Sequence, residues 1–212
     1  MLKTFFFSVI LSITLLGNIM NSYAQINPGK GPFIYGEIGV GIGNFEFGEI
    51  IALNIIFGHN NIITLGACGN LRNPVGMPSD YTYTSNNGFR LFNPRPNDYP
   101  VQYMIARGLM YGKVLYTGSP NVRFILKGGL TYVKEQSYIN FKYSGGNPNY
   151  TCTKEDKSVI GFVVNPTLEL PLSRHFGFNI SLYGNINSAA SVFSINGGMI
   201  FGKLRNGKQY SF

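Results

Sequence analysis

The chain is poor in the residues that metal sites and nucleic-acid interfaces require. Only 12% of its 212 residues are charged, and it has two cysteines, two histidines and no tryptophan. No histidine, cysteine and carboxylate residues share the spacing of a metal site, so neither a metal nor another cofactor is expected. Basic residues form no cluster, which disfavours nucleic acid as a partner. The formal net charge of +8 then predicts either scattered solvated lysines or attraction to anionic lipid headgroups.

A long apolar run is also missing after the first residues. Phe5–Gly17 is almost wholly apolar, follows Lys3, and precedes a polar segment that ends in Ser22-Tyr23-Ala24. This pattern predicts a signal peptide over residues 1–24, because the apolar run is shorter than the roughly 20 residues of a membrane-spanning helix. No cysteine lies near the predicted cleavage site, so a lipoprotein is not expected. Residues 25–212 are expected to form one exported domain.

Apolar residues occur at every second position in about eight segments of this domain. The outward series predicted for the clearest segments are Ile38, Val40 and Ile42; Phe124, Leu126 and Leu130; Phe162, Val164 and Leu168; Phe178, Ile180 and Leu182; and Phe193, Ile195 and Met199. A period of two indicates β-strands, and 9–11 residues suffice for a tilted strand to cross hydrocarbon. The opposite face is mainly Gly, Ser, Asn and Thr. Because the apolar face is aromatic-rich and almost free of charge, we expect it to meet lipid, with the small and polar residues inside a narrow barrel.

The lengths of the connections provide a second test. Two are expected to be long, at about residues 70–100 and 134–157, and both are odd-numbered, whereas every even-numbered connection is short. Short periplasmic turns and freer outer loops have this parity when the N-terminus is periplasmic. The sequence therefore predicts an all-β fold: an eight-stranded antiparallel up-and-down transmembrane β-barrel with two long extracellular loops.

One charge does not fit the predicted pattern. Arg107 has the same parity as Ile105, Leu109 and Tyr111, so in a regular strand it faces lipid. We expect a bulge near Gly108 to turn it away.

On these residues the chain resembles the small outer-membrane β-barrels typified by the transmembrane domain of outer membrane protein A. The leader, the strand repeat, the loop parity and the C-terminal Phe212 carry the resemblance, and Tyr210 also fits the terminal pattern, whereas Lys208 and Asn206 depart from it. The glycine- and asparagine-rich strands and the opening Phe33–Gly39 look like outer-membrane barrels of Bacteroidetes-type bacteria. The resemblance implies an outer-membrane location, contact with outer-membrane lipid and lipopolysaccharide, and recognition of the terminal strand by the barrel assembly machinery.

The predicted interior and rim contain two groups of candidate site residues. The inward charges Glu37, Arg123, Lys127 and Glu169 are expected to form a paired network, with a salt-bridge gate as the alternative. Cys68 and Cys152 map to the same end of the barrel, in an oxidising compartment, so we expect a disulfide between them, with two free thiols as the alternative.

Tyrosines are concentrated in the two expected loops. Tyr81, Tyr83, Tyr138, Tyr143 and Tyr150 suit adaptable recognition of a surface partner or glycan, although the loops could equally be plain surface. We expect no enzyme, because His59 and His175 both map to periplasmic turns, away from any acyl chemistry on the outer leaflet. The favoured function is a structural, adhesive or assembly-related outer-membrane barrel without an open pore. A soluble periplasmic lipid-binding barrel and, less favoured, a lipid A-modifying enzyme are the alternatives.

Overall fold

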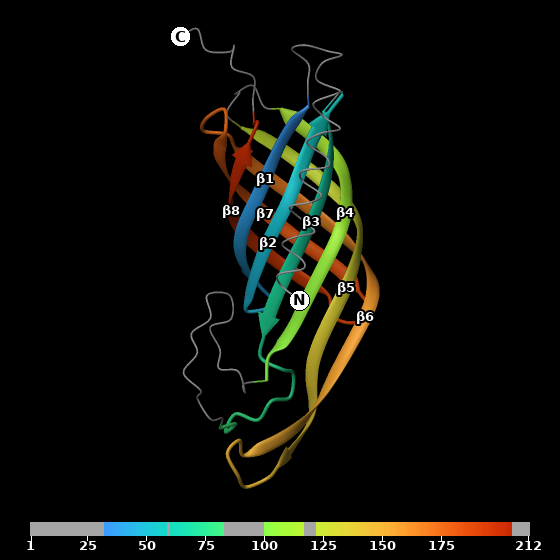
Figure 1. Ribbon diagram of the computed structural model, residues 1–212, viewed down its shortest axis with the longest axis vertical. Coiled ribbons are helices and arrows are strands. Elements are labelled where there is room, and N and C mark those ends of the chain that lie inside the picture. The colour runs from blue at the N-terminus through green and yellow to red at the C-terminus, as the bar shows by residue number, and fades with distance from the viewer. Residues whose placement is uncertain (1–31, 59, 83–99, 117–121, 205–212) are drawn as a thin grey trace.

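Eight antiparallel strands close into a barrel in the computed structural model (Figure 1), which describes residues 32–58, 60–82, 100–116 and 122–204. The strands are β1 (Phe33–Gly43), β2 (Phe47–Phe57), β3 (Asn61–Arg72), β4 (Gln102–Tyr116), β5 (Arg123–Tyr143), β6 (Tyr150–Leu170), β7 (Phe176–Asn187) and β8 (Val192–Gly202). Each strand pairs with its neighbours in the sequence, and β8 pairs with β1. The predicted eight-stranded up-and-down fold is confirmed.

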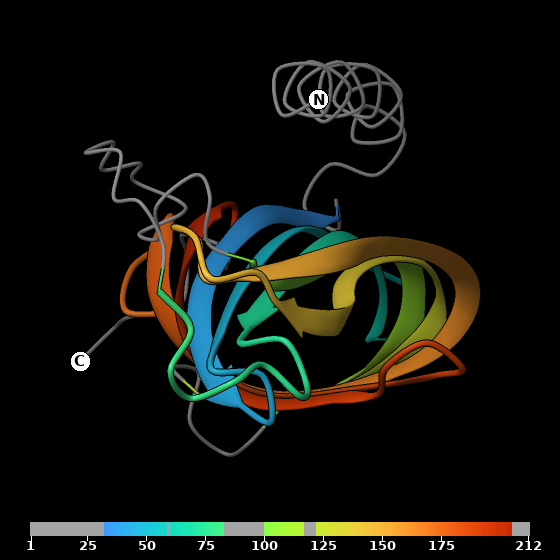
Figure 2. The ribbon, with the colours of Figure 1, turned by 90° about the horizontal axis from the view of Figure 1, so that it is seen from below.

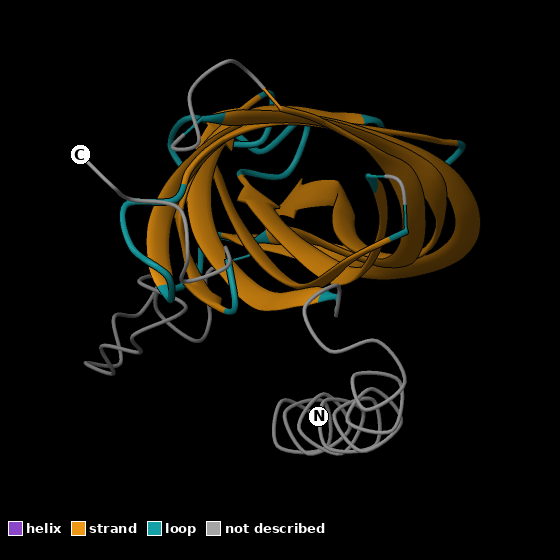
Figure 3. Cartoon of the chain, turned by 90° about the horizontal axis from the view of Figure 1, so that it is seen from above, coloured by secondary structure: helices purple, strands orange, loops and turns teal. Residues whose placement is uncertain are grey.

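The strands are tilted against the barrel axis, as the register shows. From Gly39 the pairings lead through Ile50, Cys68, Ala106 and Val133 to Val159, and in the other direction through Gly198 and Asn179 to Glu169. The two paths around the barrel therefore reach β6 at positions ten residues apart, Val159 and Glu169. Such a stagger is expected of a closed barrel with tilted strands. Seen along the axis, the strands form a ring (Figure 2 and Figure 3).

The outer surface of the barrel is apolar over most of its circumference. The exposed outward residues include Ile38, Val40 and Ile42 on β1, Leu126 and Leu130 on β5, Phe162 on β6, Ile180 and Leu182 on β7, and Phe193 and Ile195 on β8. On a soluble barrel this much hydrocarbon would face water, whereas on a transmembrane barrel it faces lipid. The exterior is therefore that of a transmembrane barrel, as the sequence predicted.

The interior is filled in layers. Tyr35, Ile62, Ile125 and Ile200 belong to an apolar cluster at one end, and Phe45, Met104, Val133 and Val192 belong to a second cluster at the other. Buried polar side chains, among them Glu37, Asn54 and Lys127, share the interior with the two clusters. An eight-stranded barrel has just enough interior volume for such a core.

One predicted loop is wrong, because most of residues 134–157 continue the strands. β5 and β6 have 21 residues each and are joined by residues 144–149, so a two-stranded hairpin projects beyond the other strands (Figure 1). A register shift between Ile139 and Lys142, with Asn140 at a φ of 56°, marks a bulge within it. We call this end of the barrel the hairpin end. The other predicted loop stands only in part, since β3 extends to Arg72 and residues 83–99 lie outside the described part of the chain.

The bulge expected near Gly108 is also wrong. β4 keeps a continuous register with both neighbours, and Arg107 is exposed on the outside, opposite Ala67 and Tyr132. Gly108 is needed for another reason, since a Cβ there would lie 2.5 Å from the carbonyl oxygen of Leu130. Arg107 is tolerated because it lies at the hairpin end of the apolar belt. On the outer face of β5, its register partner Tyr132 is followed there by the exposed Lys134. A long cationic side chain at such a border extends its charge toward water.

No helix among the described residues is long and apolar enough to cross a membrane. The predicted signal peptide and the terminal residues Tyr210 and Phe212 lie outside the described ranges.

Candidate functional site

An ion pair joins β5 and β6 inside the barrel. Arg123 and Glu169 are direct partners in the register, and Arg123 Nε lies 2.6 Å from Glu169 Oε2. The Tyr35 hydroxyl donates a hydrogen bond to Glu169 Oε1 at 2.8 Å, and Arg123 Nη1 donates to the Leu204 carbonyl at 3.0 Å. Both charged side chains are almost wholly buried. Each therefore has an opposite charge and a neutral hydrogen-bond partner, which offset part of the cost of desolvation. Arg123 Nη2 is buried without a hydrogen-bond partner among the described residues.

A second buried pair ties together more of the wall. Lys127 Nζ lies 3.3 Å from Glu37 Oε2. The amides of Asn179 and Asn54 donate to the Glu37 carboxylate at 2.6 and 3.2 Å, and the Thr64 hydroxyl donates to Asn54 Oδ1 at 2.6 Å. The five residues come from β1, β2, β3, β5 and β7. All four inward charges predicted from the sequence thus lie in the barrel as two ion pairs.

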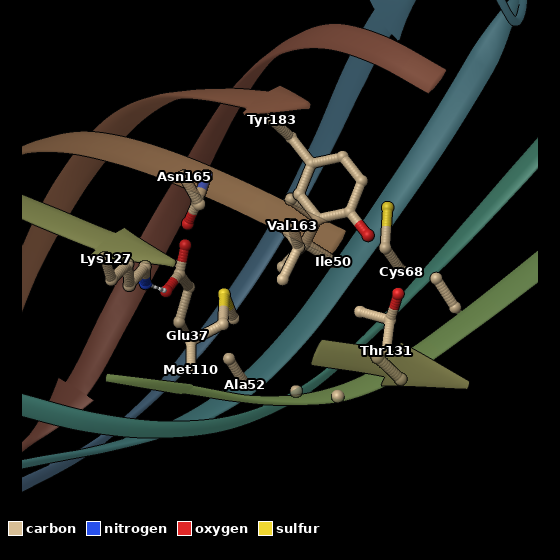
Figure 4. Close-up of a pocket in the computed structure, with 14 residues that line it drawn as sticks. Glu37, Ile50, Ala52, Cys68, Met110, Lys127, Thr131, Val163, Asn165 and Tyr183 are labelled. Atoms are coloured by element: carbon tan, nitrogen blue, oxygen red, sulfur yellow. Dashed lines mark hydrogen bonds and ion pairs between the residues drawn. The ribbon is translucent and has the colours of Figure 1, made fainter. Parts of the chain in front are cut away.

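The space beside the second pair is small. Figure 4 shows Glu37, Lys127 and Asn165 at one side of a cavity, with Cys68 and Tyr183 at the other. Its volume is about 20 Å³, enough for about one water molecule. No substrate or lipid chain fits in this cavity, and the Lys127–Glu37 pair beside it joins β5 to β1.

Four aromatic residues gather at the far end of the projecting hairpin. Tyr143 and Tyr150 are opposite each other in the last pair of β5 and β6, with ring centroids 5.5 Å apart. Tyr81, from the segment after β3, stacks on Tyr150 at 6.2 Å and meets the edge of Phe141 at 6.1 Å. Tyr143 is 71% exposed. We call these four residues the tyrosine tip.

Hydrogen bonds fix the segment that carries Tyr81. The Tyr150 hydroxyl donates to the Asp80 carboxylate at 3.0 Å, and Asn149 Nδ2 donates to the Asp80 carbonyl at 2.8 Å. The Thr82 amide donates to Asn149 Oδ1 at 2.7 Å. Because the Asp80 carboxylate stabilises the protonated phenol, it raises the pKa of Tyr150. The aromatic surface is thus held by two separate parts of the chain.

The structure brings together only some of the tyrosines that the sequence suggested. Tyr81, Tyr143 and Tyr150 meet, whereas Tyr138 lies nearer the barrel and accepts a hydrogen bond from Gln136 at 3.1 Å. Tyr83 lies outside the described residues. Sequence reasoning missed Asp80, Asn149 and Phe141. The available signal was a polar residue directly before an aromatic one, in Asp80-Tyr81 and Asn149-Tyr150, but it does not reveal which partners meet.

The disulfide between Cys68 and Cys152 does not form in the structure, where both thiols are free. Cys68 is buried in the barrel at the register level of Val159, and Cys152 lies seven positions further along β6. Seven residues of strand span roughly 23 Å, far beyond the Cα distance of about 6 Å in a disulfide. The prediction was wrong because the supposed loop is a strand that carries Cys152 away from the rim. Partial burial raises the pKa of the Cys152 thiol.

The described residues offer few groups for catalysis or metal binding. His175 lies in the turn between β6 and β7, at the end of the barrel opposite the tyrosine tip, and His59 is outside the described ranges. No group of three or more metal-binding side chains occurs in the described part of the chain.

No protein-family model matches the sequence, and no curated protein matches it. Among solved structures, the attachment invasion locus protein Ail of Yersinia pestis aligns with a TM-score of 0.49 and 9% identity, over 81% of this chain and 98% of that one. The N-terminal β-barrel domain of Pseudomonas aeruginosa OprF has a TM-score of 0.47 and 10% identity, covering 79% and 95%. Neisserial surface protein A has a TM-score of 0.47 and 9% identity, covering 81% and 95%. With likenesses this distant, the assignment of the fold rests on the strand pairing and the apolar exterior of the chain itself.

Proposed function

We propose that the protein is an integral barrel of a bacterial outer membrane, without an open pore, which presents the tyrosine tip outside the cell in an adhesive role. The observation that carries the proposal is the hairpin of β5 and β6, which projects beyond the other strands and bears the exposed ring of Tyr143. Rigid, amphipathic tyrosine rings lose little conformational entropy on binding.

The location is supported by the apolar exterior and by the predicted leader. It makes outer-membrane lipid and lipopolysaccharide the surroundings of the barrel, and the barrel assembly machinery its route of insertion. The filled interior argues against the soluble lipid-binding alternative, since that function needs an internal cavity for the lipid. No observation favours a lipid A-modifying enzyme.

The tyrosine tip favours a glycan as the extracellular partner. Aromatic rings pack on the apolar faces of sugars, and the neighbouring Asp80 and Asn149 hold polar groups beside the rings. Part of the hydrogen-bonding capacity of Asp80 and Asn149 is used within the tip, so the exposed ring of Tyr143 is the principal glycan contact that we propose.

A binding assay on whole cells tests the adhesive role. Bacteria that display the full chain should bind a glycan array more strongly than cells without it, and Tyr143→Ala should remove most of that gain. Tyr111→Ala is the matched control, because Tyr111 is an exposed tyrosine on the lipid-facing side of β4. The adhesive role is refuted if displaying cells bind no glycan above the empty host, or if both variants bind equally well.

A further inference from the structure

The projecting hairpin leaves one edge of β6 open. β6 pairs with β7 only from Gly161 onward, opposite Asn187, so residues 150–160 have no partner strand on that side within the described ranges. On the other side they belong to the ladder with β5 (Figure 1). An open strand edge offers its backbone groups to a further strand.

The backbone groups of alternate residues point out of this edge. A Cβ at Gly108 of β4 would lie 2.5 Å from the carbonyl oxygen of Leu130, so the Leu130 carbonyl points from β5 toward β4. Since successive residues of a strand point these groups to opposite sides, odd-numbered residues of β5 bond to β6. Their partners are also odd-numbered, as Ser137 opposite Glu155 shows. Even-numbered residues of β6 therefore direct their N–H and C=O groups away from β5.

A proline in the same strand agrees with this alternation. The ladder between β6 and β7 skips the two residue pairs between Val164 and Thr167, where Pro166 lies. Proline has no N–H to donate, and Pro166 keeps its place opposite Leu126 of β5. The missing N–H thus belongs to the side away from β5, as expected for an even-numbered residue.

The open edge carries charges of both signs on each face. Lys154 and Asp156 have the same parity as the outward Phe162, and Lys154 Nζ lies 3.3 Å from Asp156 Oδ2. Both side chains are at least half exposed. On the opposite face, Lys157 Nζ lies 3.1 Å from Glu155 Oε2. The charges of residues 150–160 sum to zero, so this edge lacks the single-sign charge by which many edges repel other strands.

We propose that this edge binds the same edge of a second copy of the chain, in antiparallel orientation and centred on Glu155. Residues 150–160 are symmetric about Glu155, so this register uses the whole open edge. It places Lys154 opposite the second copy's Asp156, and Asp156 opposite the second copy's Lys154. Opposite charges in such cross-strand positions stabilise an antiparallel ladder. The two copies of Glu155 meet at the symmetry axis, where the ion pair of each with its own Lys157 offsets their repulsion.

The direction of the strands determines what such a pair joins. A second barrel in the same membrane presents β6 in the parallel direction, so antiparallel pairing joins barrels in two facing membranes. That these membranes belong to two cells rests on the proposed function, which places the hairpin outside the cell. One added ladder is smaller than a standard protein interface, so contact between membranes depends on many copies acting together.

Clustering of vesicles tests the pairing. Phosphatidylcholine vesicles that carry many copies of the full chain are prepared in two fluorescent colours, and the fraction of particles with both colours is measured. Lys154→Asp and Asp156→Lys each turn both opposite-charge pairs between identical copies into like-charge pairs. Either variant alone should lower the two-colour fraction at least about tenfold. Vesicles of the two variants, mixed together, regain opposite charges in both pairs and should cluster like the wild type.

Matched variants separate the register from general charge effects. Glu155→Lys changes the charge by the same amount as Asp156→Lys, but in this register residue 155 meets only its own counterpart, so clustering should stay within about twofold of the wild type. Ser158→Pro removes an N–H of the open edge without altering charge and should lower clustering, whereas Ser158→Ala keeps the N–H and should not. Each variant is first checked for the heat-dependent gel shift of a folded barrel.

Three outcomes would overturn the proposal: wild-type vesicles that stay single, a mixture of the two charge variants that fails to cluster, or greater disruption by Glu155→Lys than by Asp156→Lys. Tyr143→Ala should leave clustering unchanged, because Tyr143 lies on β5 and outside the open edge. Lost clustering with intact glycan binding would therefore refute the pairing alone. Intact clustering with no glycan binding would refute only the glycan partner.

Discussion

At the scale of single residues, the buried charges of the barrel interior depend on one another. If Arg123→Met removes the guanidinium, Glu169 remains buried, and the Tyr35 hydroxyl is its one remaining hydrogen-bond donor among the described residues. Loss of one member of a buried ion pair costs about 3–5 kcal/mol of folding free energy. We expect a loss of this size in denaturant unfolding from detergent micelles.

The double variant Arg123→Met/Glu169→Leu separates charge from packing. Replacing both charges by apolar groups should restore most of the stability, because no uncompensated charge remains. Glu155→Gln is the surface control, since its pair with Lys157 is well exposed and is expected to contribute less than about 1 kcal/mol. A single variant as stable as the wild-type protein would mean that the pair does not hold the wall together.

The Tyr150 hydroxyl is the second residue whose loss can be predicted. Tyr150→Phe removes the hydrogen bond to Asp80, so the segment that carries Tyr81 should be cleaved faster by protease. Tyr143→Phe should have no such effect, because the Tyr143 hydroxyl makes no hydrogen bond to a described residue. Since the pKa of Tyr150 is raised in the folded tip, its stabilisation is complete below the unfolded pKa of about 10 and is lost as the pH rises through the folded value. Protease sensitivity of the wild-type segment should therefore increase at alkaline pH, and less so in Tyr150→Phe.

At the scale of strands, Pro166 has a measurable effect on the seam between β6 and β7. Pro166→Ala supplies an N–H that can donate to the Leu182 carbonyl, and an added hydrogen bond contributes about 0.5–1.5 kcal/mol. We expect slower amide hydrogen exchange in residues 181–184. Pro171→Ala, just beyond the end of β6, should leave that exchange unchanged. Unaltered exchange in both variants would show that proline does not cause the gap in the ladder.

The sequence predicted strands well where one face meets lipid and the other the core. Ile38 and Glu37, or Leu126 and Lys127, fall on opposite sides as expected, because hydrocarbon on one side enforces a period of two. Beyond the membrane both faces of a strand meet water, so the alternation disappears, and Lys134–Lys157 reads like a loop. The wrong prediction of a disulfide between Cys68 and Cys152 follows from this wrongly predicted loop. The ion pairs could be foreseen as inward charges, but the contacts of Asp80 and Asn149 join residues about 70 positions apart and leave no local pattern.

At the scale of the whole molecule, the medium around the barrel determines what its surface tolerates. Ile38 is the middle residue of β1, faces outward and is 56% exposed. In a bilayer, Ile38→Lys places an ammonium group near the midplane, which costs about 2–4 kcal/mol in a transmembrane barrel. On a soluble barrel the same change would be close to neutral, because the lysine would reach water.

Unfolding titrations in phospholipid vesicles can therefore decide between the two settings. Val75→Lys is the control, since Val75 is 71% exposed in the segment after β3, beyond the strands of the barrel. We expect Ile38→Lys to lower the stability by the stated amount, and Val75→Lys to change it little. If both lysines prove equally harmless, and the refolded chain shows no heat-dependent shift in gel mobility, the apolar belt does not face lipid. The proposed location would then fail, whereas the ion pairs inside the barrel would keep their predicted effect on stability in either medium.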